Sequence, residues 1–449
     1  MVPNFFYDKF LAGIALICVF QLMGIQHWFK LLMVAALACS GFGCGNNSMA
    51  RKPAYVNQRR VLDSSEQRKY SDSLQYFFDA LLNKKGFSGG ILVAKNGVVL
   101  YEHYQGFTNA AKTDSIDAET PFHVASTSKT FTSTAIMQLV RSGKLALNDS
   151  IQTFFKDFPY KGVTIKHLLN HSSGLPYYAN FMLRYGWNKN ITATNADVLN
   201  TLHNHQPPLD FPTGTAFKYS NTNFVLLALV VEKVSGQYFP TYVKDSIFTP
   251  AGMLNSYILN PTNTDRNMMS WSGSGRPYNF EYLDAIYGDK NVFTTCRDLM
   301  RYDSAIAYEH LLPATYLQQA WTPYFRDGHY RDSIEHYGLG WRLKVFNDSL
   351  KIPYHNGWWH GNNAVFQRLI ADTAVIIVTG NRMNNRIYSA PMAANVFRPY
   401  FNVSFSEMEA LQETIDTPLS KRPLVLPSTR NAAKKVVNRS SKKNTRKPK

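Results

Sequence analysis

The chain has 449 residues, and hydrophobic residues make up 45% of them, which is enough to bury a sizeable core and excludes a wholly disordered protein. A net charge of +17 would suit a nucleic-acid-binding protein, but its location argues otherwise. Residues 417–449 contain 11 Lys and Arg and no Asp or Glu, which leaves +6 (17 minus 11) on the first 416 residues. No nucleic-acid-binding module is evident elsewhere, so we expect no nucleic-acid partner.

Two N-terminal apolar runs, residues 10–25 and 31–38, are each shorter than a confident membrane span. The second run is typical of a signal peptide, because it follows a lysine and precedes small residues and a cysteine. Cys39 and Cys44 are therefore candidates for lipidation. The alternative is an uncleaved membrane anchor. Either interpretation predicts an exported protein, periplasmic or at the cell surface, that is held to the membrane by its N-terminus.

These features divide the chain into a leader or anchor (1–45), a linker (46–70), a folded domain (71–405) and a basic tail (406–449). The tail is rich in Lys, Arg, Asn and Ser, and we expect it to be disordered because it cannot bury apolar area. It either contacts an anionic lipid or polymer or is a solvated segment without a partner.

Within the domain, side-chain periodicity predicts a helix at residues 71–83. Further helices are expected at the apolar-rich residues 130–140, at 223–234, which end before Ser235-Gly236, and at 390–401. Asn96-Gly97 between two apolar runs predicts a β-hairpin over residues 90–101, since this pair suits a type I′ turn. A second hairpin is expected over residues 364–379, turning at Asp372-Thr373. The order of these elements indicates an α+β domain, with an antiparallel sheet covered by helices and an inserted helical region at residues 177–207. We expect the protein to be a monomer.

Cysteine and histidine offer little for metal chemistry. Cys296 is the only cysteine of the domain, which excludes a disulfide within it and a Cys-rich zinc site, and we interpret it as a buried filler. His167 and His171 have a spacing that can bind a metal, but the sequence suggests no third ligand. No metal or other cofactor is therefore expected.

The strongest chemical signal is Ser126-Thr-Ser-Lys129, which precedes an apolar helical stretch. A helix N-terminus favours developing negative charge, and residues three apart share one helical face. A serine needs an adjacent base to act as a nucleophile, and a buried lysine with a lowered pKa can serve. Ser440 and Lys443 in the tail have the same spacing but no helical context, so we assign them no role.

Two further motifs follow in order along the chain. Tyr219-Ser-Asn221 comes after a Pro-Thr-Gly-Thr-Ala-Phe segment, and His355-Asn-Gly357 comes just before the last hairpin. With Ser126 and Lys129, this order resembles the serine β-lactamase and penicillin-binding-protein family, and more closely its class C-like branch. The resemblance covers residues 87–401. Connecting segments agree with it: residues 167–176 resemble a signature loop, and residues 338–341 resemble the strand entry before the third motif.

The resemblance implies the fold described above and an acyl-enzyme mechanism. Ser126 would attack a carbonyl group, Lys129 and Tyr219 would carry protons, and Asn221 would orient the substrate. The backbone N–H groups of Ser126 and Trp358 would form the oxyanion hole. The substrate would be a small-molecule or peptide ester or amide.

The sequence departs from the family at the third motif, where His355, Gly357 and Trp358 also stand as candidate substrate-binding residues. There is no Lys-Thr-Gly, the motif that in β-lactamases helps to receive the substrate carboxylate, and Trp358 and Trp359 follow instead. We therefore expect an esterase or amidase. The alternatives are a D,D-carboxypeptidase or D-aminopeptidase acting on cell-wall peptides, a β-lactamase, and a penicillin-recognising protein that is acylated without turnover.

Overall fold

The computed structural model describes residues 61–262, 269–327, 334–347 and 349–401, all within the unit Ala54–Lys449. The predictions for the leader, for Cys39 and Cys44, and for the basic tail lie outside these residues and stay predictions. Among the described residues, no helix combines the length and the hydropathy needed to cross a membrane.

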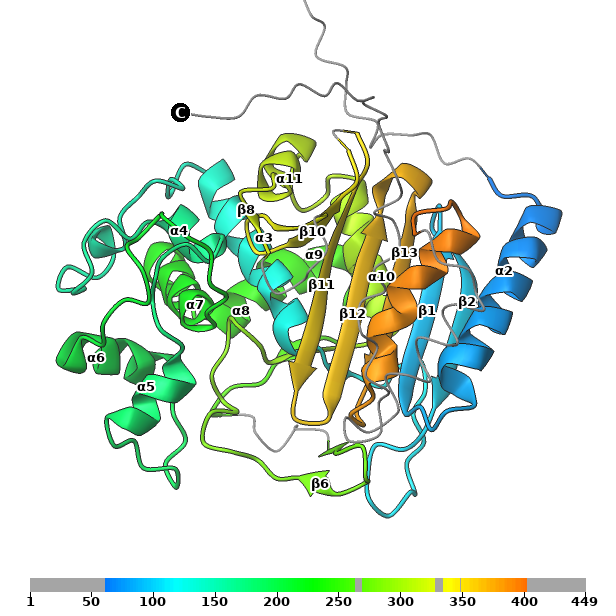
Figure 1. Ribbon diagram of the computed structural model, residues 1–449, viewed down its shortest axis with the longest axis horizontal. Helices are drawn as coiled ribbons and strands as arrows, with labels where there is room; N and C mark the ends of the chain where they lie inside the picture. The colour runs from blue at the N-terminus through cyan, green and yellow to red at the C-terminus, as the bar shows by residue number, and fades with distance from the viewer. Residues whose placement is uncertain (1–60, 263–268, 328–333, 348, 402–449) are drawn as a thin grey trace, which may run out of the picture. The chain divides into compact units, whose positions relative to one another are not determined.

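The described residues contain an antiparallel eight-stranded sheet with the strand order β2-β1-β13-β12-β11-β10-β9-β8 (Figure 1). Its strands are β1 (Gly89–Lys95), β2 (Val98–Gln105), β8 (Phe325–Arg326), β9 (Glu335–Tyr337), β10 (Arg342–Val345), β11 (Lys351–Trp359), β12 (Asn362–Leu369) and β13 (Ala374–Gly380). The other strands of the described residues form two small sheets. One sheet consists of β3 (Phe122–His123), β7 (Val292–Thr294) and β4 (Tyr257–Ile258), and the other consists of β5 (Ser270–Trp271) and β6 (Pro277–Tyr278).

The described residues also contain helices. They are α2 (Ser64–Phe78), η1 (Asp79–Asn83), η2 (Ala125–Thr127), α3 (Ser128–Arg141), η3 (Ile151–Thr153), α4 (Ile165–Leu169), α5 (Tyr178–Arg184), α6 (Asn195–His205), α7 (Thr222–Ser235), α8 (Phe239–Val243), η4 (Lys244–Phe248), α9 (Thr249–Ala251), α10 (Cys296–Ala307), α11 (Ala314–Ala320), η6 (Ile370–Asp372) and η7 (Asn385–Val396). The inserted helical region predicted between the two parts of the sheet is confirmed by α5 and α6.

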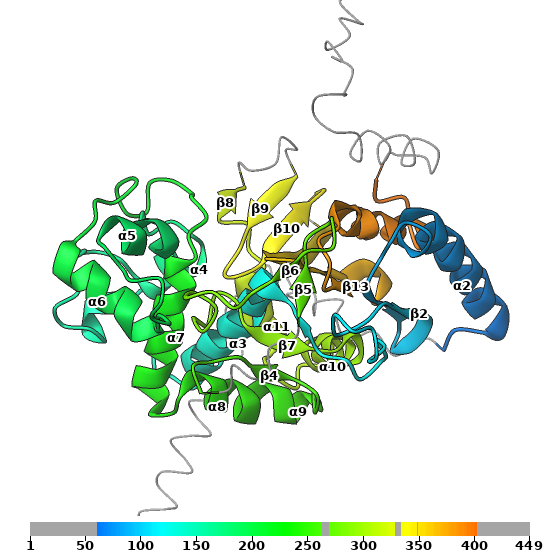
Figure 2. The same ribbon diagram turned by 90° about the horizontal axis from the view of Figure 1, so that it is seen from below.

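Both faces of the large sheet are buried. Successive side chains of a strand point to opposite faces. On β13, Val375 and Ile377 pack into a core with α3 and α10, whereas Ile376 and Val378 pack into a core with α2 and η7. The sheet is thus the middle layer between two layers of helices, as Figures 1 and 2 show. This arrangement confirms the predicted fold class.

The N-terminal part of the fold follows from local sequence signals. Asp63 and Glu66 form a capping box, so α2 begins at Ser64, before the predicted start at residue 71. The hairpin of β1 and β2 is confirmed, because Asn96 and Gly97 both have positive φ angles (54° and 79°), as a type I′ turn requires.

The predicted helices at residues 130–140 and 223–234 are confirmed as α3 and α7, and α7 ends at Gly236 with a φ angle of 71°. The last predicted helix is present, but its bounds differ from the prediction. It is a 3₁₀ helix, η7, that covers Asn385–Val396, whereas the prediction was residues 390–401. Asn384 caps its start by accepting from the Arg386 N–H at 3.0 Å, and Pro391 lacks the N–H that an α-helix interior needs.

Candidate active site

Ser126 lies in a tight turn at the start of the helix that carries Lys129. The short 3₁₀ helix η2 contains Ser126 and leads directly into α3. Ala125 has a φ angle of 46°, a left-handed conformation that costs about 1–3 kcal/mol for a residue other than glycine and is often found at functional sites. The Ser126 side chain is partly exposed while its neighbours in the turn are buried. The turn therefore presents this hydroxyl to a reactant.

Lys129 lies one helical turn later and is fully buried. Its Nζ donates to Ser126 Oγ at 3.0 Å and to the backbone oxygen of Asp289 at 2.7 Å. Burial lowers the pKa of Lys129 to about 7; the Asp289 charge opposes this shift and the Arg342 charge adds to it. A large fraction of Lys129 is therefore neutral near pH 7, with a lone pair available to accept the Ser126 proton.

Tyr219 precedes α7 and lies across from Lys129. Lys129 Nζ is 5.0 Å from the centre of the Tyr219 ring. Burial raises the pKa of Tyr219 above its usual value, although the Arg342 charge and a hydrogen bond with Ser126 act in the opposite direction. Tyr219 is consequently a phenol at neutral pH. Ser126 thus contacts Lys129, whose pKa is lowered, and Tyr219, whose pKa is raised. Opposite pKa shifts of this kind allow one site to contain both a base and an acid.

Asn221 directly precedes α7, and its side chain makes no capping hydrogen bond to the helix. Its Oδ1 is buried and has no hydrogen-bond partner among the described residues, while its side chain bonds to the Tyr177 hydroxyl. A buried acceptor without a donor costs about 1–3 kcal/mol. An N–H donor on a bound molecule would remove this cost.

The third motif lies on β11, at the point where this strand separates from β10. Pairing with β10 ends at Tyr354, and the following residues lie against η2. Gly357 is required here, because a Cβ at this position would lie 2.1 Å from the Val124 oxygen. Thr127 Oγ1 also donates to the His355 oxygen at 3.3 Å. The close approach sets Trp358, which is 56% exposed, near the Ser126 turn.

The His355 side chain points into the protein. It is fully buried, and its Nε2 lies 3.2 Å from the Tyr337 hydroxyl. The same hydroxyl lies 3.2 Å from Nε2 of His171, whose Nδ1 accepts from the Ser220 N–H at 3.2 Å. Burial, with smaller contributions from Lys129 and Arg342, lowers the pKa of both histidines far below the usual range. His355 is therefore placed to support the site from behind, through Tyr337.

His167 and His171, whose spacing could suit a metal, bond to different partners in the structure. The His171 ring contacts the Tyr219 ring at 4.3 Å, and both of its nitrogens have hydrogen-bond partners. His167 Nδ1 accepts from the Thr164 N–H at 3.3 Å in the capping box of α4. The described residues contain no group of three or more His, Cys, Asp or Glu that could hold a metal. Cys296 is buried beside Thr379, and burial raises its pKa to about 12.

Arg342 was missed by the sequence analysis. It forms a buried ion pair with Asp327, and its guanidinium carbon lies 5.2 Å from the centre of the Tyr219 ring. It directly follows Gly338-Leu-Gly-Trp341, a segment that the sequence did single out. Asp289 was missed as well, because it lies in Gly288-Asp-Lys-Asn291, a segment that belongs to none of the predicted motifs.

The chain matches known proteins over most of its length. The family model described as Beta-lactamase matches residues 74–390. Penicillin-binding protein 4* of Bacillus subtilis (strain 168) is 31% identical over 370 residues, which cover 78% of this chain and 81% of the relative. The solved structure of a penicillin-binding protein from Bacillus halodurans has 28% sequence identity and a TM-score of 0.63, and covers 72% of this chain and 98% of its own.

A D-amino acid amidase from Ochrobactrum anthropi SV3 has the same fold at 18% identity, with a TM-score of 0.59 over 77% of this chain and 99% of its own. The family match spans more than half of the chain and includes the Ser126 turn, the Tyr219 segment and β11. These findings agree with the resemblance carried by the three motifs. The chain belongs to the Beta-lactamase family and is a serine hydrolase of that fold.

Proposed function

We propose that this protein is an exported hydrolase that cleaves an ester or amide bond through an acyl-enzyme on Ser126. The observation that carries the proposal is the 3.0 Å contact between Ser126 Oγ and the buried Nζ of Lys129. Covalent catalysis by serine requires a base beside the hydroxyl that can accept its proton, and Lys129 is such a base because its pKa is lowered to about 7.

In the acylation step, Ser126 Oγ bonds to the substrate carbonyl carbon while its proton passes to neutral Lys129. The developing oxyanion would be held by the backbone N–H groups of Ser126 and Trp358, and the contact of β11 with η2 supports this assignment. Tyr219 donates its phenolic proton to the leaving oxygen or nitrogen as the scissile bond breaks. Transfer of a proton from Lys129 to the Tyr219 phenolate restores both groups.

In the deacylation step, water attacks the acyl carbon and gives a proton to Tyr219, which passes its own phenolic proton to neutral Lys129. Ser126 Oγ leaves the acyl carbon and takes a proton from Lys129, so the enzyme returns to its starting state. Asn221 would receive an N–H of the substrate at its unsatisfied Oδ1, which favours an acylamino or peptide-like substrate.

The peptidase alternative draws support from the names of the relatives. A D-amino acid amidase shares the fold, and a penicillin-binding protein is 31% identical. A dedicated β-lactamase is less favoured, because the described part of β11 offers buried His355 where Lys-Thr-Gly would present a lysine. Exposed Trp358 favours a flat or apolar acyl group.

Labelling the intact protein with a fluorophosphonate and with a fluorescent penicillin, and then following loss of the label, tests this proposal. We expect stable labelling by the fluorophosphonate and turnover of short p-nitrophenyl esters. A penicillin label that persists, without ester turnover, would instead support the penicillin-recognising protein. Efficient hydrolysis of a cephalosporin would contradict the ester or amide preference.

We further propose that an N-terminal lipid or apolar anchor holds the domain outside the cytoplasm. The small residues before Cys39 and Cys44 and the polar run after Cys44 support this. One acyl chain anchors only weakly, so the basic tail would strengthen binding to an anionic membrane. Changing both cysteines to serine should abolish incorporation of a fatty-acid analogue. Absence of incorporation in the wild type would contradict lipidation, and an uncleaved N-terminus would indicate a simple anchor.

A further inference from the structure

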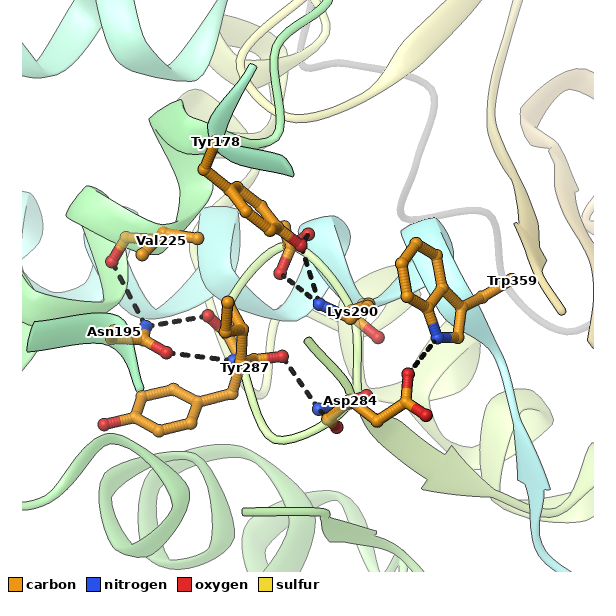
Figure 3. A network of polar contacts seen from close by, with 12 residues as sticks. Tyr178, Asn195, Val225, Asp284, Tyr287, Lys290 and Trp359 are labelled. Carbon is orange, nitrogen blue, oxygen red and sulfur yellow. Dashed lines mark hydrogen bonds and ion pairs between the residues drawn. The ribbon is translucent and has the colours of Figure 1, made fainter. Parts of the chain in front are cut away.

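Three buried polar side chains lie directly behind Lys129 and take no part in the steps proposed above. Tyr178 OH donates to Asp289 Oδ2 at 2.9 Å and accepts from Lys290 Nζ at 2.7 Å. Lys290 Nζ also lies 3.7 Å from Asp289 Oδ1, and the two charged side chains are only 3% and 0% exposed. Figure 3 shows Lys290 between Tyr178 and Trp359, whose ring centre is 4.8 Å from the ammonium nitrogen.

The segment that carries this cluster is fixed to the helical layer on both sides. The Asn195 side chain bonds to both the N–H and the oxygen of Tyr287, at 3.1 and 2.9 Å (Figure 3). Thr132 Oγ1, on α3, donates to the Gly288 oxygen at 2.6 Å. These contacts hold the backbone oxygen of Asp289 in place as the hydrogen-bond acceptor for Lys129 Nζ.

The Asp289 carboxylate alone would hinder catalysis. A buried negative charge near an amine favours the protonated amine, and a protonated Lys129 cannot accept the Ser126 proton. The Asp289 charge does act on Lys129 in this direction. A compensating positive charge at the same depth would cancel this effect, and Lys290 supplies it beside Asp289. Burial lowers the pKa of Lys290, but the Asp289 and Asp284 charges oppose this shift and favour its protonated form.

We propose that Asp289, Lys290 and Tyr178 form a positioning unit for Lys129, in which Lys290 neutralises the Asp289 carboxylate and Tyr178 links the two. The unit keeps the backbone oxygen of Asp289 within hydrogen-bond distance of Lys129 Nζ, and it allows Lys129 to remain neutral. This inference rests on the proposed role of Lys129 as the base.

Other charged or titratable groups also face Lys129, and the variants below leave them in place. They are Ser126 on η2, His171 after α4, Tyr219 before α7, Arg342 on β10 and His355 on β11.

The test measures kcat/KM for an activated ester against pH in four variants of the full chain. Lys290→Met leaves the Asp289 charge uncompensated, so the midpoint of the acid limb should rise by about one pH unit or more. Asp289→Asn leaves the Lys290 charge uncompensated, so the midpoint should fall by a similar amount. The double variant should return close to the wild-type midpoint. Lys351→Met is the matched control, because Lys351 is a half-buried lysine that bonds to the Trp321 oxygen instead, and its midpoint should not move.

A structural role alone predicts a different result. The two single variants would then lose thermal stability and activity together, without midpoint shifts of opposite sign, and that outcome would overturn the positioning unit. If Lys290→Met does not fold, the fall of the midpoint in Asp289→Asn and its reversal in the double variant decide the question. Activity that survives Ser126→Ala would instead overturn the proposed function itself, so the two failures are distinguishable.

Discussion

The guanidinium of Arg342 lies 5.2 Å from the centre of the Tyr219 ring. Its ion pair with Asp327 fixes it there, with 10% and 1% of the two side chains exposed. A positive charge at this distance favours the deprotonated forms of both Tyr219 and Lys129. Arg342 thus acts on both of the proposed proton carriers.

Replacing Arg342 by methionine should shift the acid limb of kcat/KM to higher pH. Loss of the positive charge removes a repulsion that lowers the pKa of Lys129, so Lys129 should keep its proton to a higher pH. Loss of the buried ion pair with Asp327 should also cost about 3–5 kcal/mol of unfolding free energy. Denaturant unfolding and a pH profile measure the two effects separately. An unchanged midpoint in folded protein would show that Arg342 has no electrostatic role.

The pH dependence of the wild type should reflect Lys129. Its pKa is lowered to about 7, so the base is protonated below that pH and neutral above it. We expect kcat/KM to fall about tenfold per pH unit below pH 7 and to level off above it. Activity that stays constant down to pH 5 would be incompatible with Lys129 as the base.

Substituting phenylalanine for Tyr219 should affect amides more than activated esters. An amide nitrogen needs a proton to leave, and loss of general acid catalysis costs about 10²- to 10⁴-fold. A p-nitrophenolate leaves without that proton, so its release should suffer less, although deacylation still slows. Single-turnover rates for a matched ester and amide measure the difference. Equal, small losses on both substrates would remove Tyr219 from the mechanism.

Gly357→Ala should lower kcat strongly, because the new Cβ would force β11 away from the Ser126 turn. Gly338→Ala is a suitable control, since its Cβ would meet the Ala320 oxygen at 2.2 Å, where no proposed catalytic group lies. Both variants should lose stability in thermal unfolding. Only Gly357→Ala should lose activity per folded molecule, and equal activity in the two would show that the approach of β11 is not needed.

Local signals in the sequence were sufficient for most of the fold. Asn96-Gly97 predicted a hairpin, an apolar-rich stretch predicted α3, and Ser235-Gly236 predicted the end of α7, because these features depend on neighbouring residues alone. The bounds of the last helix were predicted less well. It is a 3₁₀ helix with Pro391 inside, a residue that lacks the N–H of an α-helix interior.

The candidate site was predicted less completely. Ser126 and Lys129 share one turn of a helix that the sequence predicts, so their spacing in that context predicted their contact. The inward direction of His355 depends on Tyr337 and His171, and the placement of Arg342 depends on Asp327. Such contacts join segments far apart in sequence, and periodicity carries no information about them.

The most direct test of the whole account is to identify the residue that a fluorophosphonate modifies, by mass spectrometry of the digested protein. We expect the adduct on Ser126, with complete loss of labelling in Ser126→Ala. Labelling should be unchanged in Ser440→Ala, which removes the other serine with a Ser-x-x-Lys spacing. An adduct on any other serine, or full labelling of Ser126→Ala, would contradict Ser126 as the nucleophile.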